Sequence, residues 1–391
     1  MSIILTNKQE EGLKICLDRY YKGFKYTTIS GYAGTGKSTL VKFLVQALPV
    51  HENDVVYCSF TGKAAQVLMS KGNTNACTLH HLLYESIPRP DGTFLRKPVR
   101  DIGYKVVVVD EVSMVPKEMI DLLLKQDTYV IFLGDPFQLP PIDKTADNHL
   151  LDNPHIFLDE IMRQALDSEI IRLTLAIREG KTILPYKGSE VQILNQKDLN
   201  MSMLNWADQI ICGTNKTRTD INQQMRNWLG RDDEPCDGDK VICLRNYWDD
   251  FADNGDYLVN GTIGYVDNSY LTFHQVPPYF GGQVIKVFAA DFISEDDANY
   301  GRISMDMKQI LTGERTLDSK TIYRLMRSKK FSHLVPYEFT YAYAITCHKA
   351  QGSQWEDVLV IEEKFPFDKE EHARWLYTSC TRAISKLVLI R

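Results

Sequence analysis

The sequence predicts an α/β protein with two parallel-sheet lobes, a small β-hairpin inserted in the first lobe and a small β-barrel inserted in the second. Three observations predict this architecture. A glycine-rich loop joins an apolar strand to an amphipathic helix within 26–48. Four consecutive valines at 106–109 suit a strand buried on both faces of a parallel sheet. From 237, short β-prone runs alternate with Gly, Asn and Asp, and buried strands return after 336, so the barrel is an insertion.

The glycine-rich loop "GYAGTGKST" predicts a phosphate site. It fits the pattern G-x-x-x-x-G-K-[ST] through Gly31, Gly36, Lys37 and Ser38. Glycines let the backbone curl so that several N–H groups point at one phosphate, at the positive end of the following helix. We expect Lys37 to reach the terminal phosphates and Ser38 to hold Mg²⁺.

Two acids follow the valine strand in "KVVVVDEVSM". Asp110 and Glu111 emerge at the carboxyl end of the strand, where ligands bind in parallel sheets. Adjacent acids after a strand can also form a solvated turn, but the phosphate loop favours a shared site. We expect Asp110 to hold Mg²⁺ and Glu111 to polarise an attacking water. Gln138, in the proline-flanked loop of "GDPFQLPP", is expected to sense the γ-phosphate.

Further polar residues lie where strands meet helices. Thr61 and Lys63 open a helix in a way that suits phosphate binding. Thr78 and His80 precede another short helix, and here a helix cap and a surface histidine are the alternative interpretation. Asn215 stands at a similar junction of strand, turn and helix.

Two segments interrupt the alternation of strands and helices. In 84–104, a Pro-Asp-Gly turn predicts a hairpin with Phe94 near its tip, and Phe94 either packs on the parent lobe or touches a partner. In 318–333, Lys320, Arg324 and Arg327 share one helix face. That face is either solvated or a surface that tracks phosphates.

The eight cysteines are scattered, and no two are three residues apart as a zinc knuckle requires. The adjacent Cys347 and His348 therefore do not predict a zinc site, and the thiols are expected to act as small buried hydrophobes. With a net charge of −6 the chain as a whole repels phosphate, so any nucleic-acid contact would have to come from a local basic groove. The sequence shows neither a secretion signal nor an apolar run long enough for a membrane span, and we expect a cytoplasmic protein.

These motifs, in this order, resemble those of the superfamily 1 DNA helicases, most specifically the RecD-like and phage Dda-like branch. The resemblance extends from "LTNKQ" at 5–9 to "YTSCTRA" at 377–383. It implies two RecA-like motor lobes and an SH3-like barrel. The expected boundaries are 1–83 and 105–154 for the first lobe, 84–104 for the hairpin, 155–236 and 336–391 for the second lobe, and 237–335 for the barrel with its basic segment.

The resemblance also implies residue roles. Gln9 resembles the adenine-contacting glutamine, Arg163 an arginine that reaches the nucleotide from the second lobe, and Arg382 the principal arginine finger. Nucleotide contacts are implied at Gly31, Gly34, Thr35, Gly36, Lys37, Ser38, Thr39, Gln351 and Gly352. Contacts to the nucleic-acid strand are implied at Thr61, His80, Thr346 and His348. We expect further DNA contacts at Lys63, Thr78, Phe94 and Asn215.

The implied function is an ATP- and Mg²⁺-dependent helicase that moves 5′→3′ on single-stranded DNA and unwinds duplex in replication, recombination or repair. Phe94 or Tyr84 would then be the wedge of a strand-splitting pin. A translocase that displaces bound proteins, an RNA-directed motor and a non-catalytic ATP-gated clamp are the alternatives. Expected partners are single-stranded DNA, strand junctions and single-strand-binding or replisome proteins. We expect a monomer in the cytoplasm of a bacterium or of a phage-infected host.

Overall fold

The computed structural model describes residues 5–70, 72–73, 75–88, 94–141, 146–161, 167–255, 257–363 and 368–391. The chain divides into two compact units. The first unit comprises Met1–Leu83, Pro98–Gly213 and Cys347–Arg391, and the second comprises Tyr84–Lys97 and Thr214–Thr346. None of the helices in the described parts of the chain combines the length and hydrophobicity that a bilayer crossing requires.

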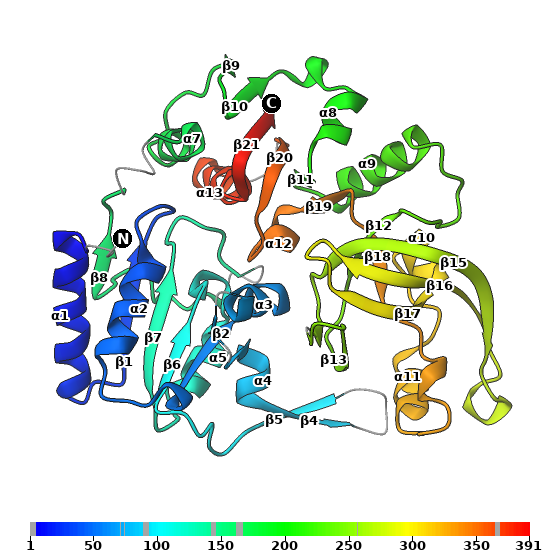
Figure 1. The fold of residues 1–391 in the computed structure, drawn as a ribbon, viewed down its shortest axis with the longest axis horizontal. Helices are drawn as coiled ribbons and strands as arrows, with labels where there is room; N and C mark the ends of the chain where they lie inside the picture. Colours follow the sequence, from blue (N-terminus) through cyan, green and yellow to red (C-terminus); the bar gives the residue numbers. More distant parts are fainter. Residues whose placement is uncertain are drawn as a thin grey trace. The chain divides into compact units, whose positions relative to one another are not determined.

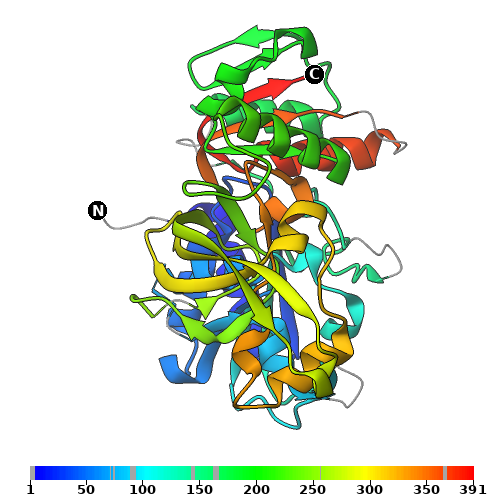
Figure 2. The same ribbon diagram turned by 90° about the vertical axis from the view of Figure 1, so that its right-hand side faces the viewer.

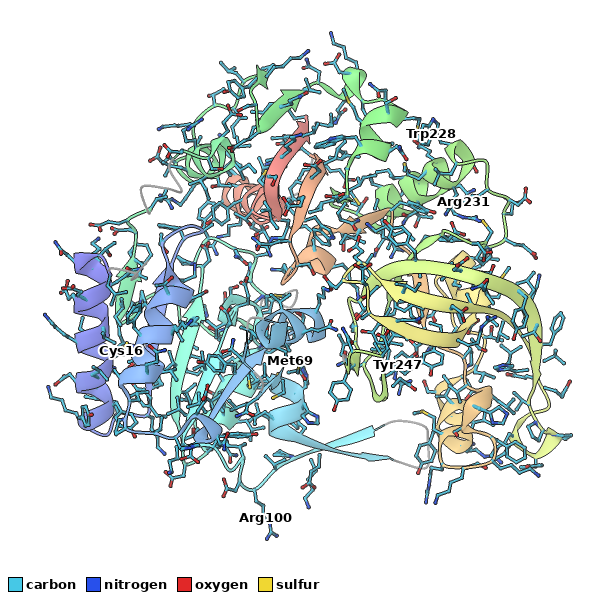
Figure 3. The ribbon with its side chains drawn as sticks, in the orientation of Figure 1. Cys16, Met69, Arg100, Trp228, Arg231 and Tyr247 are labelled. Carbon is cyan, nitrogen blue, oxygen red and sulfur yellow. The ribbon has the colours of Figure 1, made fainter. Side chains whose placement is uncertain are left out.

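The first unit contains a six-stranded parallel sheet (Figure 1). Its strand order is β3 (Ala76–Thr78), β2 (Val55–Ser59), β6 (Val106–Val109), β7 (Tyr129–Gly134), β1 (Tyr26–Gly31) and β8 (Ile156–Leu158). The helices of this region are α1 (Asn7–Tyr21), α2 (Lys37–Ala47), α3 (Gly62–Ser70), α4 (Leu79–Leu83) and α5 (Lys117–Leu123). Ile29, Val108 and Ile131 form one core cluster with residues of α1 and α2, including Cys16 (Figure 3). The predicted valine strand is therefore buried on both faces, as its composition requires.

The edge strand β8 departs from the expected boundary between the lobes. The sequence predicts that the second lobe begins at 155, but Ile156, Phe157 and Leu158 pair in parallel with Ile29, Ser30 and Gly31 of β1. Three residues give too short an apolar signal to assign a strand to one sheet or the other. The chain thus leaves the first sheet only after Leu158.

A second sheet lies in the same unit, where its strands run in the order β11 (Gln209–Cys212), β20 (Trp355–Ile361), β21 (Ala383–Ile390), β10 (Val191–Leu194) and β9 (Tyr186–Lys187). All of these pairs are parallel except that of β9 with β10. The accompanying helices are α7 (Glu169–Arg178), α8 (Met201–Trp206), α12 (Cys347–Ala350) and α13 (Lys369–Cys380). The predicted α/β fold with parallel sheets is confirmed.

The second unit is built on a five-stranded antiparallel sheet with the order β17 (Asn299–Asp306), β16 (Val284–Ser294), β15 (Ile263–Gln275), β12 (Lys240–Cys243) and β18 (Phe339–Tyr341). Phe288, Phe292 and Phe339 lie in its core. Met305 of β17 forms a bridge with Tyr337, just before β18, so the two edge strands approach each other. The predicted barrel and its SH3-like class stay a proposal.

The second unit also contains the helices α9 (Asn215–Trp228), α10 (Met307–Thr312) and α11 (Ser319–Met326) and the strands β13 (Tyr247–Phe251), β14 (Tyr257–Leu258) and β19 (Ala344–Thr346). The expected hairpin corresponds to a two-stranded sheet of β4 (Tyr84–Pro88) and β5 (Phe94–Pro98). Its predicted turn at 89–93 and the side chain of Phe94 lie outside the described residues.

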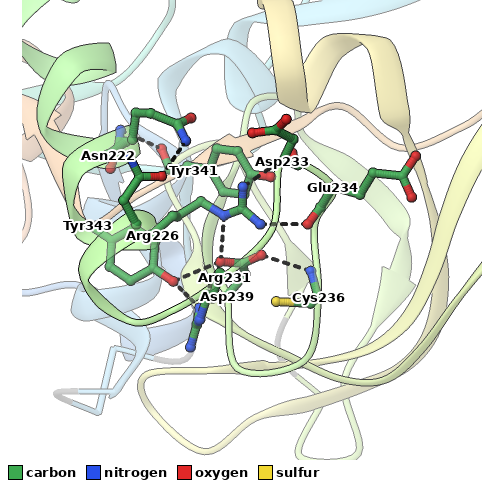
Figure 4. A network of polar contacts seen from close by, with 11 residues as sticks. Asn222, Arg226, Arg231, Asp233, Glu234, Cys236, Asp239, Tyr341 and Tyr343 are labelled. Atoms are coloured by element: carbon green, nitrogen blue, oxygen red, sulfur yellow. Dashed lines mark hydrogen bonds and ion pairs between the residues drawn. The ribbon is translucent and has the colours of Figure 1, made fainter.

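A buried ion pair holds α9 to the start of the barrel (Figure 4). Arg226 and Asp239 have fully buried side chains, and Arg226 Nε donates to Asp239 Oδ1 over 3.1 Å. The Arg226 guanidinium also donates to the carbonyl oxygens of Asp233 and Glu234. Asp239 accepts from the Tyr343 hydroxyl over 2.8 Å. Sequence reasoning did not find this pair because its two members lie on different elements.

We expect Asp239→Asn to destabilise the second unit by about 3–5 kcal/mol, because it leaves the buried Arg226 charge uncompensated. Urea unfolding followed by circular dichroism measures this loss. The matched control is Glu314→Gln, which breaks the exposed pair with Lys308 and should cost less than about 1 kcal/mol. Equal unfolding midpoints for the two variants would contradict the assignment.

Candidate nucleotide site

The phosphate loop lies between the end of β1 and the start of α2. Gly34 and Gly36 adopt the left-handed conformation with φ of 77° and 78°. A Cβ atom on Gly31 would lie 2.7 Å from Thr35 Oγ1 and 2.8 Å from the Leu158 carbonyl oxygen. The curled backbone therefore requires glycine at these three positions.

Two polar side chains brace this loop. The Lys37 ammonium donates to the carbonyl oxygens of Gly31 and Tyr32 over 2.6 and 3.0 Å. Gln9, fully buried in α1, donates from Nε2 to the carbonyl oxygens of Thr35 and Gly36 over 3.4 and 3.2 Å. Gln9 Oε1 accepts from the backbone N–H of Thr6 over 2.9 Å. In this structure Gln9 fastens α1 to the phosphate loop, and its contact with adenine stays a prediction.

The predicted acids follow β6, next to the loop after β2. The Asp110 backbone N–H donates to the Cys58 carbonyl oxygen, and the Glu111 N–H donates to Asp110 Oδ1, both over 2.8 Å. Glu111 has φ 53° and ψ 44°, a left-handed conformation that costs a side-chain-bearing residue free energy. Backbone strain of this kind concentrates at functional sites.

The loop after β7 contributes Asp135 and Gln138, both buried. Burial raises the pKa of the Asp135 carboxyl, while Lys37 and the Tyr377 hydroxyl act in the opposite direction. Gln138 Oε1 is buried and has no hydrogen-bond partner among the described residues. A buried acceptor without a protein partner suits a site that is completed by a ligand or water.

Tyr377 of α13 joins the second sheet to this site. Its hydroxyl donates to Asp135 Oδ2 over 2.6 Å and accepts from the Ala33 backbone N–H over 3.0 Å. The neighbouring Thr378 Oγ1 accepts from the Leu139 N–H over 3.0 Å, and Gln351 Nε2 donates to the Leu139 carbonyl oxygen over 3.4 Å. Elements of both parallel sheets thus meet at the phosphate loop.

Sequence reasoning missed Asp135 and Tyr377 as site residues. Asp135 lies in "GDPFQ" with Gln138, and Tyr377 lies in "YTSCTRA" with Arg382. An acid in one motif and a hydroxyl in another give no signal of mutual contact until the two sheets are assembled.

Arg382, the expected arginine finger, donates hydrogen bonds to oxygens of nearby residues of the second sheet region. Arg382 is buried and donates from Nε to the Thr378 carbonyl oxygen over 3.0 Å. Its other nitrogens donate to the Ser353 carbonyl oxygen over 3.4 Å and to Thr381 Oγ1 over 3.1 Å. A catalytic role for Arg382 stays a prediction, and Arg163 lies outside the described residues.

The residues present fit a nucleoside triphosphate with a divalent cation. The curled glycine loop and Lys37 would hold phosphates, and Ser38 and Asp110 would hold Mg²⁺. The buried Gln138 acceptor and the strained Glu111 lie on the neighbouring strand ends, where the chemistry of such a site takes place.

The expected strand-contacting residues of the first sheet lie at helix starts. Thr61 Oγ1 accepts from the Ala64 N–H over 3.3 Å, and the buried Thr78 Oγ1 accepts from the His81 N–H over 3.2 Å. The His80 ring lies 5.4 Å from that of Phe60. Both threonines therefore cap helices, which for Thr78 is the alternative interpretation, and their role toward nucleic acid stays a prediction. Lys63 is half-buried in the first turn of α3.

Cys347 is a packing residue, as predicted. It is fully buried, its Sγ donates to the Trp375 carbonyl oxygen over 3.7 Å, and burial raises the pKa of its thiol to about 12. Burial lowers the pKa of the half-buried His348, and the Cys-His pair therefore holds neither a thiolate nor an imidazolium at neutral pH.

Gly352 lies close to the start of α3, beside the first sheet. It has φ 82°, and a Cβ there would lie 2.9 Å from Thr61 Oγ1 and 2.7 Å from Ala64 Cβ. The segment of Gln351 and Gly352 thus touches both the Leu139 loop and the start of α3.

Thr346 ends β19, half-buried. Asn215, in the second unit, lines a cavity of about 600 Å³ along the start of α9, together with Lys216, Arg218 and Thr219.

Comparison with known proteins identifies the family. The model of an AAA domain matches residues 7–199, and that of the UvrD-like helicase C-terminal domain matches residues 341–390. The chain is 25% identical over 400 residues to the ATP-dependent RecD2 DNA helicase of Deinococcus radiodurans, covering 92% of this chain and 46% of that protein. It is 29% identical over 196 residues to the ATP-dependent DNA helicase Dda of Enterobacteria phage T4, covering 45% and 43%. The two family models and these relatives together support a superfamily 1 helicase of the Pif1, RecD and Dda type.

Solved structures agree on the fold of this helicase-family chain. A Pif1 helicase from Candida albicans matches with a TM-score of 0.56 and 18% identity, covering 100% of this chain and 95% of that one. A Bacteroides Pif1 bound to ssDNA matches with a TM-score of 0.52 and 18% identity, covering 99% and 92%. The chain spans less than half the length of the two curated helicases named above.

Proposed function

We propose that this chain is an ATP-driven motor that moves 5′→3′ along single-stranded DNA and unwinds duplex DNA. The observation that carries the proposal is the Tyr377 bridge. Tyr377 of α13, a helix that accompanies the second sheet, contacts both the phosphate loop and Asp135 at the first sheet. A structural change at the phosphates therefore acts on both sheets. A motor requires this coupling, and a passive nucleotide-binding domain does not.

The chemistry follows from the arrangement of the chain's own groups. ATP with Mg²⁺ supplies the phosphoryl group that is transferred to water. Lys37 neutralises phosphate charge, Glu111 orients and polarises the water, and Gln138 positions it beside the phosphates. Arg382 stabilises the transition state after exchanging its present carbonyl partners for phosphate oxygens. Hydrolysis then depends on the position of α13, and so on the second sheet.

DNA is proposed as the track because the relatives are DNA helicases by name and a structural neighbour was solved with single-stranded DNA. The proposal includes contacts at Thr61, His80, Thr346 and His348, a pin formed by the β4–β5 hairpin, and an SH3-like barrel. It also includes a monomeric, cytoplasmic protein that acts at strand junctions in replication, recombination or repair, beside single-strand-binding or replisome proteins.

The test uses duplexes that carry a single-stranded tail on only one side. With ATP and Mg²⁺ we expect unwinding of the 5′-tailed duplex and little unwinding of the 3′-tailed one. Lys37→Ala should abolish both unwinding and DNA-stimulated ATP hydrolysis, because it removes the cation that holds the phosphates.

Absence of DNA-stimulated hydrolysis in the wild-type chain would overturn the motor proposal. Unwinding of the 3′-tailed duplex alone would reverse the direction. Removal of bound protein from single strands without any unwinding would support the translocase alternative, and stimulation by RNA alone would support an RNA-directed motor.

A further inference from the structure

A small helical cap closes one end of the long strands in the second unit. Val276, Ile285 and Val287 at the ends of β15 and β16 form a hydrophobic cluster with Leu317, Ile322 and Leu325 from α11 and its approach. Figure 2 shows α11, in orange, beside the tip of these strands. The cap therefore has its own core and holds its surface side chains on an ordered scaffold.

The outer surface of this cap is basic. We define the basic cap by five exposed cations, which are Lys320, Arg324, Arg327, Lys329 and Lys330. None of the five forms an ion pair with another of the described residues. Cations elsewhere in the same unit do have carboxylate partners, as Lys286 has Glu234, Arg302 has Asp291 and Lys308 has Glu314. The one acid next to the helix, Asp318, accepts from the Thr321 backbone N–H and hydroxyl as the N-cap of α11. In a chain of net charge −6, a cluster of cations that form no ion pair indicates an anionic partner.

The helix spaces these charges along a line. Ile322 and Leu325 of α11 are buried, whereas Lys320, Arg324 and Arg327 are exposed. At 1.5 Å per residue, the successive charged positions are about 6 and 4.5 Å apart along the helix axis. The row from Lys320 to Arg327 is thus about 10.5 Å long. Each DNA strand presents one phosphate per about 3.4 Å of duplex axis, so a row of this length faces about three phosphates of one strand.

Two aromatic side chains of the cap, Phe280 and Phe331, contact cations of the cap and each other. The Arg324 guanidinium lies 5.1 Å from the centroid of the Phe280 ring, and Lys330 Nζ lies 5.3 Å from that of Phe331. The rings of Phe280 and Phe331 also contact each other edge to face at 5.7 Å. Binding of single strands depends on free ring faces that stack with bases. Phe280 and Phe331 are half-buried and each has a cation over its ring, which leaves Tyr279, 59% exposed, as the accessible ring of this group. Arg324 and Arg327 donate to the Tyr279 carbonyl oxygen and to the Tyr323 hydroxyl. The exposed ammonium groups of Lys320, Lys329 and Lys330 form no hydrogen bond with the described residues, and they suit phosphates.

We propose that the basic cap binds the phosphate backbone of double-stranded DNA without reading its sequence. The inference rests on the proposed function only in taking DNA as the polymer. The anionic row of a duplex is continuous and stiff, and it complements cations fixed on a helix. Such contacts would give the motor a grip on duplex that is separate from the single strand on which it moves.

The test compares two triple variants with equal change in charge. Lys320→Gln/Lys329→Gln/Lys330→Gln removes three of the five positive charges of the basic cap and keeps the two arginines. The control, Lys286→Gln/Arg302→Gln/Lys308→Gln, removes three cations of the same unit that have carboxylate partners. Fluorescence anisotropy without nucleotide measures the affinity for a blunt duplex and for a single strand of equal length, across a range of salt concentrations.

We expect the cap variant to bind blunt duplex at least tenfold more weakly at low salt, with the slope of log K against log salt reduced by about 3. Its affinity for single strands and its ATP hydrolysis with single-stranded DNA should stay within about twofold, while the control keeps its duplex affinity. Matching thermal melting curves show that the cap stays folded.

The inference is overturned if cap and control variants bind duplex equally well, or if the cap variant loses affinity for single strands instead. Because the assay contains no ATP, its outcome is independent of the motor proposal. Duplex binding through the cap in a chain that hydrolyses no ATP would leave this inference standing and overturn the motor.

Discussion

Arg382→Ala is expected to lower the turnover of ATP hydrolysis, measured with single-stranded DNA present, by about 10³–10⁵-fold. An arginine finger acts mainly on the transition state, so the affinity for ATP should change little. Arg382 follows the C-cap of α13 and is five residues beyond Tyr377, whose hydroxyl touches the phosphate loop. Steady-state ATP hydrolysis and equilibrium binding of a fluorescent ATP analogue separate the two effects.

Arg382 also has a structural role, which the experiment must separate from catalysis. Its guanidinium donates to the carbonyl oxygens of Thr378 and Ser353, and its loss can loosen this region. Arg374→Ala is the matched control, because this arginine of the same helix pairs with exposed Glu370 over 2.9 Å. Unchanged turnover in Arg382→Ala, with an unchanged melting temperature, would remove Arg382 from the catalytic site.

Glu111→Gln is expected to lower the rate of ATP hydrolysis by about 10²–10⁴-fold while nucleotide and DNA still bind. The amide keeps the size of the side chain but is a far weaker base than the carboxylate. The backbone bond from the residue 111 N–H to Asp110 Oδ1 is retained. Single-turnover hydrolysis of bound ATP measures the chemical step directly.

Glu118→Gln in α5 serves as its control, because that glutamate is exposed and lies beyond the loop that carries Glu111. Wild-type hydrolysis by Glu111→Gln would place the base elsewhere. Asp135 would then be the next residue to change, because its carboxyl touches the hydroxyl that reaches the phosphate loop.

Local sequence signals predicted those parts of the site that lie on one strand and in the loop directly after it. The phosphate loop needs three glycines in fixed positions, and the acids follow a run of four valines that can only be a buried strand. Composition also predicted the burial of Cys347, because the thiol lies in an apolar run.

The features that were missed depend on contacts between distant segments. Tyr377 and Asp135 are 242 residues apart, and nothing in either motif indicates that they meet. Arg226 and Asp239 each look like surface charges in a polar stretch, and only the packing of α9 on the barrel buries them. The strand β8 was assigned to the wrong sheet because three apolar residues carry no information about their pairing partner.

The left-handed backbone at Glu111 has a consequence for engineering. Glycine adopts φ 53° without cost, whereas a residue with a Cβ loses roughly 1–2 kcal/mol there. A library of variants selected only for heat resistance would therefore be drawn toward glycine at position 111, and each such clone would lose the carboxylate. Thermal stability and the rate of ATP hydrolysis therefore place opposite demands on residue 111. A thermostable variant that keeps Glu111 has to gain its stability at other positions.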